Sequence, residues 1–127
     1  MTDRARIERF VRGTLGCTCA PQVFAVIEDL PPDGAVPGAP RRISVGGRLL
    51  IHLVEDTGLP TPDRLAGWVR AGREERDRKA MNRFRLVIAT DNPAALREPL
   101  GEEFRRLPDI DERTHLHLVE RSALAGL

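Results

Sequence analysis

Two cysteines separated by a single residue form the most specific chemical motif of the sequence. Cys17 and Cys19 are the only cysteines of the chain, and they come just before Pro21. Proline suits the first position of a helix, where unpaired N–H groups and the helix dipole favour a nearby thiolate. The motif therefore predicts thiol redox chemistry, sulfur transfer or soft-metal binding. One cysteine would attack or ligate, and the other would resolve the adduct or complete the chelate.

The same two residues also have a structural interpretation. Cysteine is among the most frequently buried residue types and packs as a small apolar side chain. A disulfide between Cys17 and Cys19 would close a very small, strained ring, which suits a transient redox role better than a permanent bridge. If both cysteines are structural, the alternative hypothesis is a non-enzymatic protein-interaction module. The sequence leaves open whether the chain is an enzyme.

A metal site is the second chemical hypothesis, with zinc or another soft metal as the cofactor. His115 and His117 alternate with leucines near the C-terminus, so in a strand both histidines point to one face, about 6–7 Å apart. Together with Cys17 and Cys19 they make a conceivable Cys₂His₂ set. The competing interpretation is an exposed polar strand face, with Leu116 and Leu118 on the other side. A third histidine, His52, stands inside an apolar run and is expected to be a hydrogen-bonded core residue.

Charge and missing motifs exclude several other functions. The formal net charge is +1, so no global field attracts nucleic acid or an anionic membrane. Residues 70–85 hold seven cations and three anions, but interleaved charges are typical of a solvated helix face, and the chain has few aromatic residues for base stacking. Nucleic-acid binding is therefore not favoured. The chain also lacks a phosphate-binding loop and a Gly-x-Ser-x-Gly nucleophile elbow.

Apolar spacing predicts the elements that must position these residues. Helices are expected over 3–14, from Pro21 to about Leu30, over 61–79, and from Pro93 onward, where Pro99 should kink or split the helix. A strand over 22–28 is the alternative to the second of these helices. Strands are expected around Ile43–Val45, Leu49–Val54, Phe84–Ala89 and His115–Glu120. Gly46-Gly47 is typical of a two-residue hairpin turn. The prediction is one α/β domain over 1–127: a mixed sheet with a β-hairpin and two βαβ crossovers, preceded by two N-terminal helices.

The region around the cysteines resembles a segment of small uncharacterised prokaryotic proteins. The similarity covers Leu15 to Phe24 together with the preceding Phe10-Val11-Arg12. In those proteins an amphipathic N-terminal helix leads into a Leu-Gly-Cys-x-Cys stretch, followed by a proline and Val-Phe. This resemblance implies no activity.

Location and partners follow only in outline from the sequence. Arginines interrupt the N-terminal segment, which therefore lacks the apolar core of a signal peptide, and no apolar run is long enough to cross a membrane. The sequence thus predicts a cytoplasmic protein without membrane contact. A protein partner or a second copy of the chain is the expected kind of partner, through the N-terminal helix or an edge strand.

Overall fold

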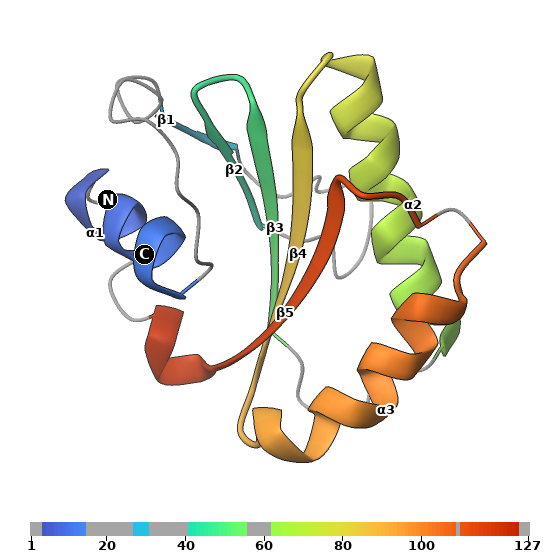
Figure 1. The fold of residues 1–127 in the computed structure, drawn as a ribbon. Coiled ribbons are helices and arrows are strands. Elements are labelled where there is room, and N and C mark those ends of the chain that lie inside the picture. The colour runs from blue at the N-terminus through green and yellow to red at the C-terminus, as the bar shows by residue number, and fades with distance from the viewer. Residues whose placement is uncertain (1–3, 15–26, 31–40, 56–61, 109, 125–127) are drawn as a thin grey trace.

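The computed structural model describes residues 4–14, 27–30, 41–55, 62–108 and 110–124. Within these ranges a five-stranded mixed sheet separates two layers of helix, which confirms the predicted α/β class (Figure 1). In chain order the elements are α1 (Arg4–Arg9), η1 (Phe10–Thr14), β1 (Ile27–Leu30), β2 (Arg41–Val45), β3 (Leu49–Glu55), α2 (Pro62–Arg78), β4 (Arg83–Thr90), α3 (Pro93–Arg106), β5 (Thr114–Glu120) and η3 (Arg121–Leu124).

The strands lie in the sheet in the order in which they follow along the chain. β1 is antiparallel to β2, and β2 is antiparallel to β3, whereas β3, β4 and β5 are parallel to one another. β5 therefore forms one edge of the described sheet, and β4 is its hydrogen-bonded neighbour. Helix α2 connects β3 to β4, and α3 connects β4 to β5.

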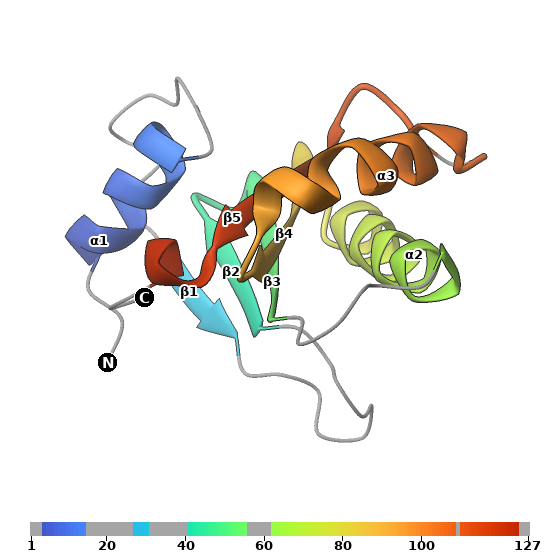
Figure 2. The same cartoon turned by 90° about the horizontal axis from the view of Figure 1, so that it is seen from below.

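Two apolar cores lie on opposite faces of the sheet. On one face, Ile7, Phe10 and Val11 of α1 and η1 pack against odd-numbered residues of β2 to β5. On the other face, α2 and α3 pack against even-numbered residues of β3 to β5. The two views show α1 on one side of the sheet and α2 and α3 on the other (Figures 1 and 2). Residues 49–54 are buried on both faces, as their almost continuous apolar run predicts.

Glycines occupy two tightly constrained places in this framework, the turn between β2 and β3 and the contact between α2 and β4. Gly46 and Gly47 adopt φ angles of 63° and 65°, and the N–H of Arg48 donates to the carbonyl of Val45, which joins β2 to β3 by a tight turn. Gly72 lies where α2 crosses β4, so close that an added Cβ would overlap the ring of Phe84. This close contact seats α2 against the sheet.

Two elements differ in detail from the helices expected from the sequence. Ile27–Leu30 is a strand rather than the end of a helix, because its residues pair antiparallel with Arg42–Val45; residues 21–26 lie outside the described ranges. Pro99 does not split the last long helix, which is continuous from Pro93 to Arg106. Pro99 lies on an exposed side of α3, where water can hydrate the carbonyl that loses its helical donor. Among the described residues, no helix is long and apolar enough to cross a membrane.

Candidate functional site

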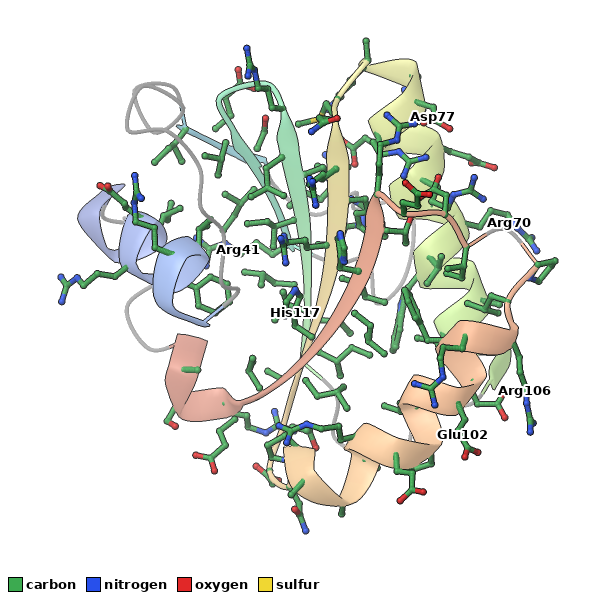
Figure 3. The ribbon with its side chains drawn as sticks, in the orientation of Figure 1. Arg41, Arg70, Asp77, Glu102, Arg106 and His117 are labelled. Carbon is green, nitrogen blue, oxygen red and sulfur yellow. The ribbon has the colours of Figure 1, made fainter. Side chains whose placement is uncertain are left out.

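Of the four predicted site residues, the two histidines lie in the described part of the chain and the two cysteines do not. Cys17 and Cys19 lie outside the described residues, so their proposed chemistry stays a prediction. His115 and His117 lie on β5, and both point to the face on which α1 packs, since their register neighbours Arg85 and Val87 alternate with core residues of the opposite face. In Figure 3, His117 lies about midway along the length of the strands.

Each of these histidines is paired with an arginine of β4. Arg85 Nη1 lies 2.7 Å from His117 Nε2, and Arg83 Nη1 lies 3.4 Å from His115 Nε2. A guanidinium only donates hydrogen bonds, so each Nε2 must accept, and each neutral ring carries its proton on Nδ1. The four side chains therefore form an Arg–His quartet (Arg83, Arg85, His115 and His117) whose remaining hydrogen-bonding groups include several donors.

Burial and neighbouring positive charge keep the histidines of the quartet neutral. Burial lowers the pKa of His117 to about 4, with further contributions from Arg85 and His115. Burial, Arg85 and Arg83 lower the pKa of His115 in the same direction. Neutral imidazoles can bind metals, but in the described part of the chain no three His, Cys, Asp or Glu side chains are grouped to hold one.

The main concave feature beside the quartet is a pocket of about 580 Å³ between α3 and the edge strand β5. We call it the β5-edge pocket. It is lined by residues of both elements: Arg97, Gly101, Phe104, Arg105, Thr114, His115, Leu116, His117, Leu118 and Val119. The α3 residues are spaced by four, three and one, which places them on one side of the helix. The β5 residues are consecutive, so the pocket runs along the strand edge itself.

Charges on α3 are sorted by sign around this pocket. Arg97 and Arg105 line it, and both are exposed. The glutamates of the same helix do not line it (Glu98, Glu102 and Glu103). Glu102 and Arg106 lie on the outer side of α3 (Figure 3). Among the described residues, no acidic side chain lines the pocket, and the charged groups nearest to it are arginines, including Arg83 and Arg85 behind the histidines.

A second polar cluster is centred on the buried Glu75 of α2. Glu75 Oε1 accepts from His52 Nε2 at 2.9 Å, while Oε2 accepts from Arg42 at 3.0 Å and from Lys79 at 2.6 Å. Burial alone would raise the pKa of Glu75, but hydrogen bonds from Lys79 and His52 outweigh it and lower the pKa to about 2. Neither His52 nor Glu75 lines the β5-edge pocket. This cluster ties α2 to β2 and β3.

His52 itself is the hydrogen-bonded core histidine that its position predicts. Its side chain is buried, and burial lowers its pKa although Glu75 opposes the shift. Because a carboxylate only accepts, Nε2 carries the proton, and buried Nδ1 has no hydrogen-bond partner among the described residues. A protonated Nδ1 would leave a buried donor unsatisfied, which gives a second reason for the neutral form.

A third cluster shows why part of the basic helix end is structural. Arg76 is 1% exposed and donates to both carboxylate oxygens of Asp111, at 3.0 and 2.8 Å. It also donates to Asp77 and Thr114. Arg76 thus lies in the interior and not on the solvated face that residues 70–85 predict as a group. It anchors the segment before β5 to α2.

Sequence reasoning missed the α3 half of the pocket. The residues concerned are Arg97, Gly101, Phe104 and Arg105. The available signal was weak: two arginines eight residues apart with a glycine midway, on a helix whose glutamates fall elsewhere. Comparisons with protein-family models, curated proteins and solved structures gave no match to this chain.

Proposed function

We propose that this chain is a non-enzymatic protein-interaction module that binds an extended acidic segment of a partner protein as an added strand on β5. The observation that supports the proposal best is the position of the β5-edge pocket, directly along an edge strand. Every second residue of such a strand directs its N–H and C=O away from the neighbouring strand. A partner segment in extended conformation can satisfy these groups, and the pocket can receive its side chains.

An added strand would pack beside helix α3 as well as pair with the edge of β5. α3 and β5 are adjacent elements, and Phe104 and Gly101 face the strand across the pocket. Because Gly101 has no side chain, the surface of α3 is recessed at that point. A bound segment would therefore pair with β5 through its backbone and be held by side-chain contacts with α3.

Charge favours an acidic partner over a second copy of this chain. The charged side chains in the described lining of the pocket are arginines, and none of these lining residues is acidic. Pairing β5 with β5 of a second copy would bring two Arg–His quartets together, with unfavourable repulsion. A carboxylate-bearing segment would instead accept charge-assisted hydrogen bonds from the arginines. We place this interaction in the cytoplasm, as the sequence predicts.

The proposal is tested by amide hydrogen exchange of the full chain with a defined probe. The probe is a soluble peptide of about eight residues, rich in Glu and Val, with both ends blocked. The expected result is slower exchange at alternate amides of β5, because these amides gain acceptors on binding. No change in β5, or a change confined to α3, would overturn the proposal.

Two controls separate strand pairing from simple charge attraction. The first is the same peptide with alternate backbone amides methylated, which removes its donors and should abolish protection of β5. The second compares Gly101→Glu with Gly101→Gln. An added Cβ at Gly101 meets Arg105 Nη1 at 3.4 Å, a flexible side-chain end, so both variants should fold. Gly101→Glu should bind the acidic peptide more weakly than Gly101→Gln, because only Glu repels it.

A further inference from the structure

The two sides of β5 offer different chemistry to an added strand. On the side of the sheet facing α1, the segment meets His115 and His117, with Arg83 and Arg85 directly behind them. On the other side, it meets Leu116, Leu118 and Phe104, all half-buried. The first side therefore offers hydrogen-bond donors and positive charge, and the second offers an apolar surface flanked by Arg97 and Arg105 of α3.

The donors on the first side are suited to carboxylates. Both histidines use Nε2 to accept from an arginine, so their Nδ1–H groups remain as donors. The guanidinium groups add positive charge within the same quartet. An acidic side chain that arrives here gains charge-assisted hydrogen bonds, whereas a lysine would meet repulsion.

Because the two sides of β5 differ in chemistry, the geometry of an added strand requires a particular residue pattern in the partner segment. Successive side chains of an extended segment point to opposite faces of the sheet. From the two-sided chemistry of β5 we infer that the partner segment alternates acidic and apolar residues, the acidic ones over the Arg–His quartet and the apolar ones between β5 and α3. This inference rests on the proposed function and adds the recognition pattern.

The arginines of α3 set the length of the pattern. Arg97 and Arg105 are eight residues apart on one helix, a rise of about 12 Å. A strand covers this distance in about four residues. The pocket thus holds two acidic and two apolar residues, and the exposed arginines lie at its two ends, where they can attract further acidic residues on either side.

The test compares three blocked peptides of about eight residues by fluorescence anisotropy with the full chain. The first alternates Glu and Val. The second has the same composition but places the residues in pairs, Glu-Glu-Val-Val. The third alternates Lys and Val. The alternating Glu–Val peptide is expected to bind about tenfold more tightly than the paired one, because the paired peptide directs Glu into the apolar side. The Lys–Val peptide should show no binding.

Matched variants on α3 locate the binding site. The double variant Arg97→Gln/Arg105→Gln removes both pocket arginines and should weaken binding of the alternating Glu–Val peptide by about tenfold. Arg106→Gln removes an arginine of the same helix that does not line the pocket, and it should leave the affinity unchanged. Equal losses in the two variants would show a non-specific charge effect and overturn the inference.

The possible failures are distinguishable. If the paired and alternating peptides protect β5 equally and bind equally, the recognition pattern is wrong and the proposed strand addition stands. If neither peptide protects β5, the proposed function fails, and the pattern fails with it. A short oligothymidylate serves as the nucleic-acid probe. The oligothymidylate could bind more tightly than every peptide and lose this binding in Arg97→Gln/Arg105→Gln. That result would overturn both the proposed function and the recognition pattern.

Discussion

Arg85 donates a hydrogen bond to His117 diagonally across the parallel pair β4 and β5, with 2.7 Å between Nη1 and Nε2. Arg85 is 9% exposed, so a permanent positive charge lies next to a titratable ring in a largely buried position. Protonation of His117 would replace the accepted hydrogen bond with repulsion between two cations. The pair therefore couples the protonation of His117 to the stability of the sheet edge.

This coupling predicts that the chain loses stability in mild acid. The pKa of His117 is lowered from 6.5 to about 4 in the folded chain. Below pH about 6.5 the unfolded chain binds a proton that the folded chain does not, so acid favours unfolding until the pH reaches about 4. His117→Gln retains an acceptor for Arg85 without a titratable ring. Between pH 7 and 4.5, its free energy of unfolding should fall by about 1–2 kcal/mol less than that of the wild type.

Urea unfolding at several pH values measures this difference. His52, whose pKa is also lowered, titrates in both proteins, so its contribution cancels in the comparison. Parallel stability curves for His117→Gln and the wild type would show that His117 does not titrate as described.

The framework of the sheet could be predicted from local patterns. Residues 49–54 and 84–89 are short apolar runs, and burial on both faces makes such runs strands whatever their exact partners. Asn92 before Pro93 is a clear helix start, and its side chain accepts from the N–H of Ala95 as a cap. These features depend on interactions within a few residues, which the sequence displays directly.

The features that failed or were missed depend on distant partners. Residues 27–30 have an apolar spacing compatible with a helix, and only pairing with β2 makes them a strand. Arg76 looks like one of several surface cations until Asp111, thirty-five residues later, is brought beside it. The β5-edge pocket likewise exists only because α3 packs next to β5. These relationships leave at most a weak local signal in the sequence, such as the spacing of Arg97, Gly101 and Arg105.

Substitution of Gly72 should reveal the close contact between α2 and β4. Gly72→Ala places a methyl group into the Phe84 ring and should destabilise the fold by about 1–3 kcal/mol. Gly67→Ala is the matched control, because Gly67 lies in the same helix with open space around its Cβ position. That variant should stabilise the chain by about 0.5–1 kcal/mol through helix propensity. Thermal and urea unfolding measure the change in stability of both variants. If Gly72→Ala and Gly67→Ala change the stability in the same direction, the close contact between Gly72 and Phe84 is contradicted.

The end of α2 provides a position where glycine should improve stability. Ala80 has a φ of 54°, and the N–H groups of Ala80 and Met81 donate back to the carbonyls of Asp77 and Arg76. This left-handed cap favours glycine. Ala80→Gly should raise the free energy of unfolding by about 1 kcal/mol, whereas Ala71→Gly, within α2, should lower it by a similar amount. If both variants lower the stability equally, the cap geometry is wrong.

The cysteine hypothesis can be tested independently of the pocket. If Cys17 and Cys19 are reactive, their alkylation near neutral pH should be faster than that of a free thiol, and Cys19→Ser should change the rate at Cys17. Elemental analysis of chain purified without chelators tests for zinc. Rates equal to those of an ordinary thiol, with no bound metal, would refute the chemical role. A Cys17→Ala/Cys19→Ala variant should still bind the alternating Glu–Val peptide, because the described lining of the β5-edge pocket comes from β5 and α3.

The buried pair of Arg76 and Asp111 should contribute strongly to stability. Hydrogen bonds from Arg76 hold the pKa of Asp111 well below its usual range, which indicates a firmly bound carboxylate. Arg76→Lys keeps the charge but loses the bidentate geometry and should destabilise the fold by about 2–4 kcal/mol. Arg70→Lys, at an exposed position of the same helix, should change stability by less than about 0.5 kcal/mol. A double-mutant cycle with Asp111→Asn separates the ion pair from packing of the Arg76 side chain. A coupling energy near zero would mean that Arg76 acts through packing alone. A coupling of about 1–3 kcal/mol identifies the ion pair as the link that holds the segment before β5 against α2.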